Sequence, residues 1–295
     1  MFFETTLTKE RIETHTEDGH WPNELLIDRF RAHLATRVEQ PLVIDRVGTM
    51  TWGEAAEAID AMSKGLLTLG VRPGDVVQLQ LPNRREFLIT VLAAEQIGAV
   101  VNPVAPIFRH NEVSVMSELA QPKVVVTIAE FRNFGLAAMH LGLREQCPWV
   151  EHVVAVPVEL GNTVPADTIG WDDLLARGRA SAYDDAALDL IRPSPNDVCE
   201  VMFTSGTTGQ PKGVMHTQNT VNAAADQWLE RIAPDAQVFH MASTLAHQTG
   251  YLFGIRAHIT AGGRVVYQEV WNPDEVAQLI ASEGIDVSMG ATPFL

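Results

Sequence analysis

Short, largely apolar runs alternate along this chain with segments whose apolar residues recur every three or four positions. Runs of the first kind suit strands, and spacing of the second kind suits amphipathic helices. Strands that alternate with helices form parallel sheets whose two faces are both covered. The pattern therefore predicts the α/β class, with largely parallel sheets covered by helices. The expected strands are VVQLQL, AVVN, KVVVT, HVVAVP, VCEVMFT, RVVYQ and IDVSMG, at residues 76–81, 99–102, 123–127, 152–157, 198–204, 264–268 and 285–290.

Capping signals indicate where two of the helices begin. Thr51 and Glu54 have the spacing of a capping box, and the apolar positions behind them run as far as Gly70, which can end the helix. Asn272 followed by Pro273 predicts a second helix start. We expect residues 1–20 to be irregular or peripheral, and residues 161–196 to form a surface excursion with one short helix. The other expected helices cover residues 86–97, 171–179 and 217–232.

Size and charge limit the classes of function. A chain of 295 residues is long enough for two domains or one two-lobed domain, and it can bury a large core without disulfide or metal support. Its 21 basic and 37 acidic side chains give a net charge of −16, which argues against nucleic acid or an anionic membrane as the main ligand. A small anionic ligand stays compatible, because a nest of backbone N–H groups can bind phosphate on an acidic protein.

Cysteine content and hydropathy bear on location. The chain has two cysteines, Cys147 and Cys199, which argues against a disulfide scaffold and a cysteine-rich zinc site. A reducing compartment is the simplest environment for such a chain. No stretch of 18 apolar residues occurs, and the first residues lack the pattern of a signal peptide. We therefore expect a cytoplasmic protein without a membrane span.

The segment TSGTTGQPKG, residues 204–213, carries the clearest chemical signal. We expect it to form a loop between the strand at 198–204 and the helix at 217–232. Its glycines permit tight turns and close approach of a ligand, and backbone N–H groups, hydroxyls and one ammonium group suit a polyphosphate. The residues that we expect to bind phosphate are Thr204, Ser205, Gly206, Thr207, Thr208, Gly209, Lys212 and Gly213.

Two other interpretations of this segment are a Walker A loop and a surface turn. A Walker A loop is disfavoured, because Pro211 precedes the lysine where glycine is required and Gly213 follows it where serine or threonine should hold magnesium. A surface turn that is rich in glycine and threonine stays open on composition alone.

The same segment resembles the phosphate loop of the adenylate-forming superfamily. That superfamily includes AMP-forming acyl-CoA synthetases, the adenylation domains of peptide synthetases, and beetle luciferases. Other segments resemble the superfamily in the same order, so the resemblance covers nearly the whole chain after about residue 20. These segments are TWGE at 51–54, RPGD at 72–75, LPN at 81–83, GAVVNP at 98–103 and STLAHQTG at 243–250.

The resemblance implies a reaction in two steps. A small carboxylic acid attacks the α-phosphate of ATP to give an acyl-adenylate and pyrophosphate, and a thiol, usually that of coenzyme A, then displaces AMP. Mg²⁺ is expected with the nucleotide, because it bridges phosphate oxygens in such sites. No residue of this chain is assigned as a metal ligand.

The resemblance also implies an acyl pocket. His247 corresponds to a position beside the reacting carboxylate, so it is our candidate catalytic residue and pocket wall; a helix-start histidine with one ordinary hydrogen bond is the alternative. Gly290, Ala291, Thr292 and Pro293 correspond to a strand and turn at the border of that pocket, and a simple turn is their alternative.

For architecture, the resemblance implies two interleaved lobes with a ligand cleft between them. One lobe is expected over about residues 72–235, and the other over about 20–71 together with 236–295. The superfamily's later motifs and its small C-terminal lid domain with a catalytic lysine are not found here. We therefore expect the N-terminal part of such an enzyme, inactive or nearly so by itself, with exposed apolar surface through which a homo-oligomer can form.

Three functions remain open from the sequence. The first is an AMP-forming carboxylate–CoA ligase, and the residues AHQTG at 246–250 look most like ligases for medium-chain, alicyclic or aromatic acids, such as cyclohexanecarboxylate–CoA ligases. The second is an adenylation domain that loads a carrier-protein thiol. The third is a nonenzymatic nucleotide-binding module.

Overall fold

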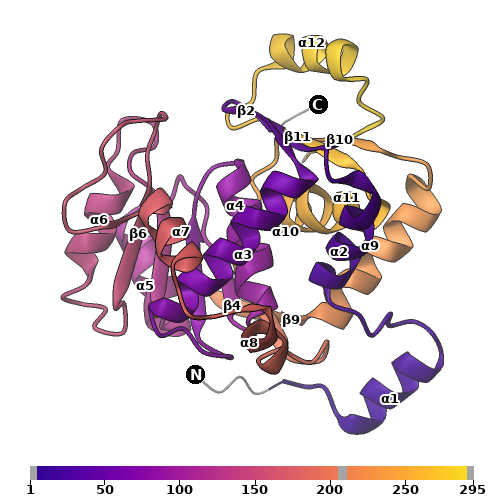
Figure 1. The fold of residues 1–295 in the computed structure, drawn as a ribbon, viewed down its shortest axis with the longest axis horizontal. Coiled ribbons are helices and arrows are strands. Elements are labelled where there is room, and N and C mark those ends of the chain that lie inside the picture. The colour runs from indigo at the N-terminus through magenta and orange to yellow at the C-terminus, as the bar shows by residue number, and fades with distance from the viewer. Residues whose placement is uncertain (1–4, 205–210, 291–295) are drawn as a thin grey trace.

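The computed structural model describes residues 5–204 and 211–290, which form two twisted sheets with helices packed around them (Figure 1). The larger sheet has seven strands, and all its neighbours are parallel except the last pair, β8 and β9. In spatial order its strands are β7 (Ile169–Gly170), β6 (His152–Val156), β5 (Val124–Ile128), β3 (Val76–Gln80), β4 (Val100–Pro103), β8 (Val198–Thr204) and β9 (Lys212–Thr217).

The smaller sheet has five strands and is parallel except for the edge pair of β1 and β2. The α/β class with largely parallel sheets is therefore confirmed. In spatial order the strands of the smaller sheet are β12 (Val287–Met289), β10 (Val238–Met241), β11 (Arg264–Tyr267), β1 (Pro41–Asp45) and β2 (Gly48–Thr51).

Helices connect the strands and cover the sheets. Thr51 and Glu54 form the predicted capping box, and Asn272 accepts hydrogen bonds from the backbone N–H groups of Asp274 and Glu275. The helices are α1 (Lys9–Glu17), α2 (Leu26–Arg37), α3 (Trp52–Thr68), α4 (Arg85–Gln96), α5 (His110–Ala120), α6 (Leu136–Leu143), α7 (Trp171–Arg179), α8 (Asp185–Leu190), α9 (Gln218–Ile232), α10 (Gln248–Tyr251), the π-helical turn η1 (Leu252–Ala257), α11 (His258–Ala261) and α12 (Pro273–Glu283).

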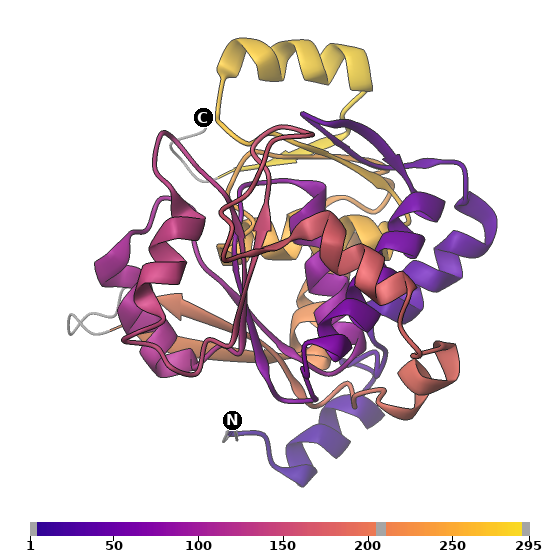
Figure 2. The ribbon, with the colours of Figure 1, turned by 60° about the vertical axis from the view of Figure 1, so that its left-hand side comes forward.

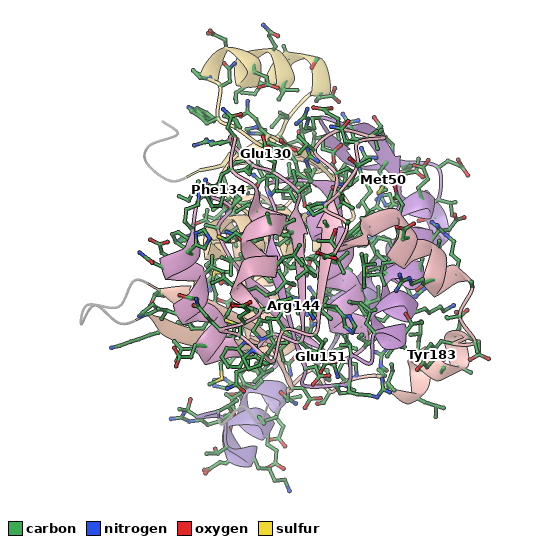
Figure 3. The ribbon with its side chains drawn as sticks, turned by 90° about the vertical axis from the view of Figure 1, so that its left-hand side faces the viewer. Met50, Glu130, Phe134, Arg144, Glu151 and Tyr183 are labelled. Atoms are coloured by element: carbon green, nitrogen blue, oxygen red, sulfur yellow. The ribbon has the colours of Figure 1, made fainter. Side chains whose placement is uncertain are left out.

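The arrangement brings the carboxyl ends of the seven-stranded sheet toward the five-stranded sheet. Figure 3 shows Glu130 and Phe134, which follow β5, at the opposite end of the sheet from Arg144 and Glu151, which precede β6. In Figures 1 and 2, α12 stands at one end of the molecule beside the five-stranded sheet. Within the described residues, no helix is long and apolar enough to cross a bilayer.

Three local expectations need correction. Residues 9–17, expected to be irregular or peripheral, are peripheral but helical: they form α1, which has no buried residue and whose first turn is capped by Thr8, the acceptor of a hydrogen bond from the backbone N–H of Arg11. Residues 161–196, expected to hold one short helix, hold α8 as well as α7, and the short strand β7. Lys212 and Gly213, expected in a loop that leads to a helix, lie instead in β9, which pairs antiparallel with β8. The glycine-rich segment therefore connects two strands of a hairpin.

Candidate active site

A cavity of about 380 Å³ lies where the carboxyl ends of both sheets meet. Three of its walls follow β3, β4 and β5, and two follow β10 and β11. Ligands of α/β proteins bind outside the carboxyl ends of parallel strands, so this cavity is the candidate site. Its lining residues are Pro82, Asn83, Ala105, Pro106, Ile107, Phe131, Arg132, Ala242, Ser243, Thr244, His247, Thr249, Glu269 and Trp271.

Asn83 joins the two sheets at the floor of this cavity. Its side chain is buried, and its Nδ2 donates to the carbonyl oxygens of Met241 (3.3 Å), Ser243 (2.9 Å) and Gln268 (3.1 Å). Its Oδ1 accepts from the backbone N–H of Leu245 at 2.9 Å. One amide from the end of β3 thereby satisfies backbone groups that follow both β10 and β11. Asn83 therefore sets the position of the loop that carries His247.

The two arginines that follow Asn83 make further connections between the sheets. Arg84 is buried; it pairs with Glu269 and donates to the backbone oxygens of Pro157 (3.2 Å) and Val158 (2.9 Å). Arg85 holds the carboxylate of Asp45, at the end of β1, with an Nη2–Oδ1 distance of 2.6 Å. Since both acids are paired, neither is an uncompensated charge beside the cavity.

Gln80 fixes another wall. Its Nε2 donates to the carbonyl oxygens of Ala105 (3.0 Å) and Phe108 (3.1 Å), and its Oε1 lies 2.7 Å from Nε2 of His140. Because Gln80 offers an acceptor, we assign the imidazole proton to that nitrogen. Burial lowers the pKa of His140 to about 3, so the ring stays neutral at physiological pH.

His247 is both a helix cap and a cavity wall. It is the N-cap residue of α10, and its Nδ1 accepts from the backbone N–H of Thr249 at 3.4 Å. Its side chain is exposed and lines the cavity. The two interpretations of this residue are therefore compatible, because the cap bond occupies one ring nitrogen and leaves the other for a ligand.

Gly250, three residues further on, allows the close packing that this loop needs. A Cβ at this position would lie 2.0 Å from the carbonyl oxygen of Thr244 and 2.8 Å from Cα of Leu245. These are backbone atoms that also form the cavity wall, so they cannot move without displacing His247. The glycine in the HQTG segment is thus explained by a close approach of helix and loop.

We predict that Gly250→Ala lowers the free energy of unfolding by about 2–3 kcal/mol, through overpacking. Urea denaturation followed by circular dichroism measures this. Gly142→Ala is the matched control, because nothing lies within 4 Å of a Cβ there, and we expect it to be neutral or slightly stabilising. Equal stability of the two variants would contradict the packing argument.

The described part of the glycine-rich segment reaches the same edge of the sheet. Thr204 ends β8 and pairs with Lys212, which begins β9, and both are exposed. Val101 of β4 pairs in parallel with Glu200 of β8, so Thr204, at the carboxyl end of β8, lies at the same edge of the sheet as the segment after β4 that lines the cavity. The predicted phosphate residues Ser205, Gly206, Thr207, Thr208 and Gly209 lie outside the described residues.

The second predicted wall is only partly described. Gly290 is the last described residue and follows β12, whereas Ala291, Thr292 and Pro293 lie outside the described residues. In contrast, several polar or aromatic residues of the cavity were not expected as site residues. For Asn83, its place in the LPN segment was an available signal, and Ser243, Thr244 and Thr249 lie in the STLAHQTG segment. Nothing local marks Phe131, Arg132, Glu269 and Trp271.

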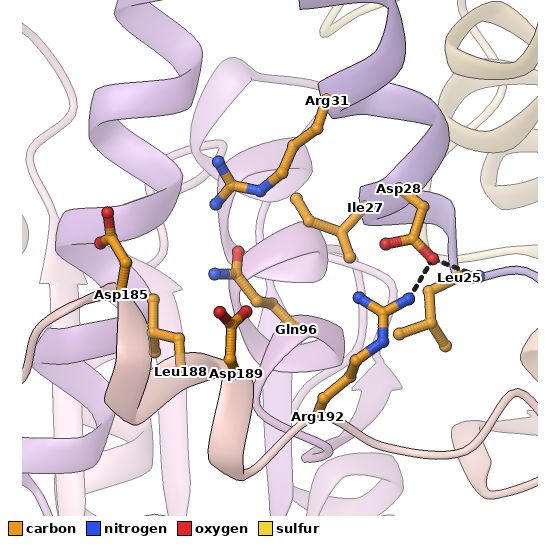
Figure 4. Close-up of a pocket in the computed structure, with 9 residues that line it drawn as sticks. All are labelled: Leu25, Ile27, Asp28, Arg31, Gln96, Asp185, Leu188, Asp189 and Arg192. Carbon is orange, nitrogen blue, oxygen red and sulfur yellow. Dashed lines mark hydrogen bonds and ion pairs between the residues drawn. The ribbon is translucent and has the colours of Figure 1, made fainter.

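A second hollow, of about 240 Å³, lies at the opposite edge of the larger sheet (Figure 4). Side chains from α2, α4 and α8 line it, and the ion pair of Arg192 with Asp28 closes one side. Gln96 ends α4 just before β4 begins, so this hollow is near the amino ends of the strands. Unlike the cavity beside His247, it does not lie at the carboxyl ends of the strands.

Metal ligands do not gather in the described ranges: residues 5–204 and 211–290 contain no group of three histidine, cysteine, aspartate or glutamate side chains placed to hold an ion. Glu269 is the one carboxylate among the cavity-lining residues described, and it pairs with Arg84 and Arg46.

Comparison with known proteins agrees with the geometry. The family profile described as AMP-binding enzyme matches residues 30–295. The medium-chain fatty-acid–CoA ligase of Escherichia coli (strain K12) is 28% identical over 292 residues, which are 98% of this chain and 50% of that protein. A salicylyl-CoA synthase / salicylate adenylyltransferase of Streptomyces sp is 26% identical over 284 residues, which are 94% of this chain and 50% of that protein. The chain thus spans about half the length of the curated relatives it matches.

A solved structure shows the same fold. The apo structure of Mycobacterium smegmatis MbtA superposes with a TM-score of 0.81 at 24% sequence identity. The match covers 96% of this chain and 51% of that chain. The two-sheet architecture is therefore one that occurs in a larger solved protein.

Proposed function

The chain belongs to the AMP-binding enzyme family, and from this premise we propose that its protein activates a carboxylic acid with ATP and passes the acyl group to coenzyme A. The observation that carries the proposal is the cavity at the carboxyl ends of the strands, the same edge of the larger sheet at which Thr204 ends β8 and the glycine-rich segment begins. One ligand can therefore extend from the cavity to that segment, as an acyl-adenylate must.

The proposed reaction needs the acid and the α-phosphate to be held in line while charge develops on phosphorus. Thr204, Lys212 and the residues between them would hold the phosphates that leave as pyrophosphate. Lys212 is exposed at the start of β9, so its ammonium group is free to reach a phosphate oxygen. His247 and Asn83 would border the acid. Because Glu269 is paired with Arg84, its charge would repel the carboxylate of the substrate less.

Mg²⁺ would enter with the nucleotide and neutralise phosphate charge. It is usually held by phosphate oxygens and waters with only one or two protein carboxylates. Two unpaired, buried cysteines, Cys147 and Cys199, fit the proposed cytoplasmic location.

The acid is proposed to be a medium-chain or alicyclic one. Apolar side chains dominate the cavity walls, with Ile107, Phe131 and Trp271 as the largest. Such walls favour hydrocarbon over polar substituents. The name of the Escherichia coli relative supports the same class.

The two lobes are proposed with the boundaries given above. The strands of the larger sheet come from residues 76–217 and fall in the lobe of 72–235, and those of the smaller sheet come from the two flanking segments. We further propose that this chain alone is inactive or nearly so, since its relatives are about twice as long.

Carboxylate-dependent exchange of labelled pyrophosphate into ATP tests the proposal, with the protein expressed from its whole gene. We expect exchange with octanoate or cyclohexanecarboxylate, and a loss of about 100–1,000-fold in Lys212→Ala, as for removal of one charge-stabilising donor. Lys9→Ala in the exposed α1 is the control. No exchange with any acid, or none that depends on Lys212, would overturn the proposal; acyl transfer to a carrier protein instead of coenzyme A would correct the acceptor.

A further inference from the structure

A cluster of ionisable side chains is buried beneath the site. Arg256 of η1 and Glu95 of α4 form an ion pair with side-chain exposures of 0% and 2%. Glu200 of β8 is also fully buried and faces the same charges. Burying charges is costly unless they are fully paired, so a cluster of this kind calls for a role other than core packing.

Arg256 connects three elements that lead to the site. Its guanidinium pairs with Glu95 and donates to Oε1 of Gln218 (3.0 Å) and Oδ1 of Asn222 (2.8 Å), at the start of α9. Its Nη2 also lies 3.8 Å from Sγ of Cys199 in β8. Gln218 follows β9 directly and donates to Glu95 at 2.6 Å. The cluster therefore holds both strands of the hairpin that carries the glycine-rich segment.

The π-helical turn lets two residues of one helix reach the same carboxylate. Tyr251 donates its hydroxyl to Oε1 of Glu95 at 2.9 Å, and Arg256 pairs with the same oxygen. In an α-helix, residues five apart point about 140° away from each other around the axis. In a π-turn, where hydrogen bonds join residues five apart, they lie one above the other. The carbonyl of Gly254 accepts from the hydroxyl of Tyr267 at 2.7 Å, which helps to hold the turn.

Thr204 and His247 lie at similar distances from this cluster, measured along the strand and the helix that lead to them. Thr204 follows Glu200 by four residues of strand, or about 13 Å. His247 precedes Arg256 by nine residues of a largely helical segment, or about 14 Å. The cluster holds β8 at Glu200 and the helical segment at Arg256. It therefore also fixes the distance between Thr204 and His247.

On these contacts, and resting on the proposed function, we propose that Arg256 is a positioning residue. Through Glu95, Tyr251 and Gln218, it sets the distance between Thr204, at the end of β8, and the acid-binding wall at His247. It contacts neither substrate itself. Its contribution should therefore appear only when one ligand spans both halves of the site.

The test measures three dissociation constants by calorimetry, with the protein expressed from its whole gene. The probes are ATP, cyclohexanecarboxylate, and a nonhydrolysable cyclohexanecarbonyl sulfamoyl-adenosine that joins the two. Arg256→Lys keeps the charge and loses the planar fork. We expect at least a tenfold weaker binding of the joined analogue, with less than a threefold change for ATP or for the acid alone.

Two further variants keep the result decisive. Tyr251→Phe removes one hydrogen bond to Glu95 and should give a smaller effect of the same kind. Leu174→Ala, at a buried position of α7, is the control for loss of stability and should leave all three constants in their wild-type ratio. Parallel weakening of all three ligands, or unchanged binding of the analogue in both variants, would overturn the inference. If wild-type protein binds none of the probes, the proposed function itself is overturned.

Discussion

Asn83→Leu is expected to lower the free energy of unfolding by on the order of 4 kcal/mol, because several buried backbone groups lose their partner. The substitution keeps the approximate volume of the side chain but removes every polar contact. The carbonyl oxygens of Ser243 and Gln268 and the backbone N–H of Leu245 each bond to this one amide. The loss falls on the junction of the two sheets, so the wall at His247 should shift as well.

Urea denaturation followed by fluorescence measures the change in stability. Asn162→Leu, at an exposed loop position, is the matched control and should stay within about 0.5 kcal/mol of wild type, as surface changes do. Binding of the acid should weaken in Asn83→Leu even at temperatures where the variant is folded. A variant as stable as Asn162→Leu would show that the sheets are joined by other contacts.

Glu200→Gln is expected to remove a pH dependence of stability and to stabilise the protein above pH 8. Burial raises the pKa of Glu200 from an ordinary value of 4.5 to about 8, with the charge of Glu95 adding to the rise and that of Arg256 opposing it. Neither carboxylate oxygen has a hydrogen-bond partner in the described structure. Cys199, Tyr251 and His216 are further ionisable groups of this cluster, and His216 pairs with Glu200 across the hairpin. Burial raises the pKa of Cys199 and Tyr251, and burial together with the charge of Arg256 lowers that of His216.

The direction in which stability changes with pH follows from the number of protons that the folded and the unfolded protein bind. Between pH 4.5 and about 8 the folded protein keeps the proton on Glu200, whereas the unfolded chain releases it, so stability falls as pH rises through this window. Each pH unit between the two pKa values corresponds to about 1.4 kcal/mol, which gives a total on the order of 5 kcal/mol. The neutral amide of glutamine has no proton to lose, so the variant should lack this part of the slope.

Urea midpoints at pH 6, 7, 8 and 9 test this expectation. Wild type should lose stability up to pH 8 and then level off, and Glu145→Gln, at an exposed position, should follow wild type. Burial lowers the pKa of both His140 and His258 to about 3. These two histidines therefore lower the stability of the folded protein only below pH 6.5, where they become protonated in the unfolded chain. Parallel profiles of wild type and Glu200→Gln from pH 6 to 9 would mean that Glu200 is ionised in the folded protein.

Local patterns predicted much of the fold. The capping box at Thr51, the Asn272–Pro273 start and the apolar runs of the strands depend on neighbours in sequence, and the structure confirms them. The strand β9 was missed because its exposed residues Val214 and Met215 carry no alternation, and its pairing with β8 is set by the hairpin. The π-turn has no local signature; it depends on Glu95, far away in sequence.

The difference between local patterns and contacts over long sequence separations also explains which residues of the site could be predicted. His247 and the glycine-rich segment stand in recognisable motifs, so the sequence sufficed to name them. The role of Asn83 depends on partners 160 to 185 residues away. The ion pair of Arg84 with Glu269 spans 185 residues, and that of Arg85 with Asp45 spans 40. Such contacts follow from how the sheets meet, which no single segment encodes.

The most direct test of the central claim is a crystal structure of the protein, expressed from its whole gene, with the cyclohexanecarbonyl sulfamoyl-adenosine analogue. We expect the cyclohexyl ring in the cavity between Asn83 and His247, with the sulfamoyl group toward Thr204 and Lys212. An analogue seated in the hollow of α2, α4 and α8, or with its ring outside the cavity beside His247, would contradict the assignment of the site.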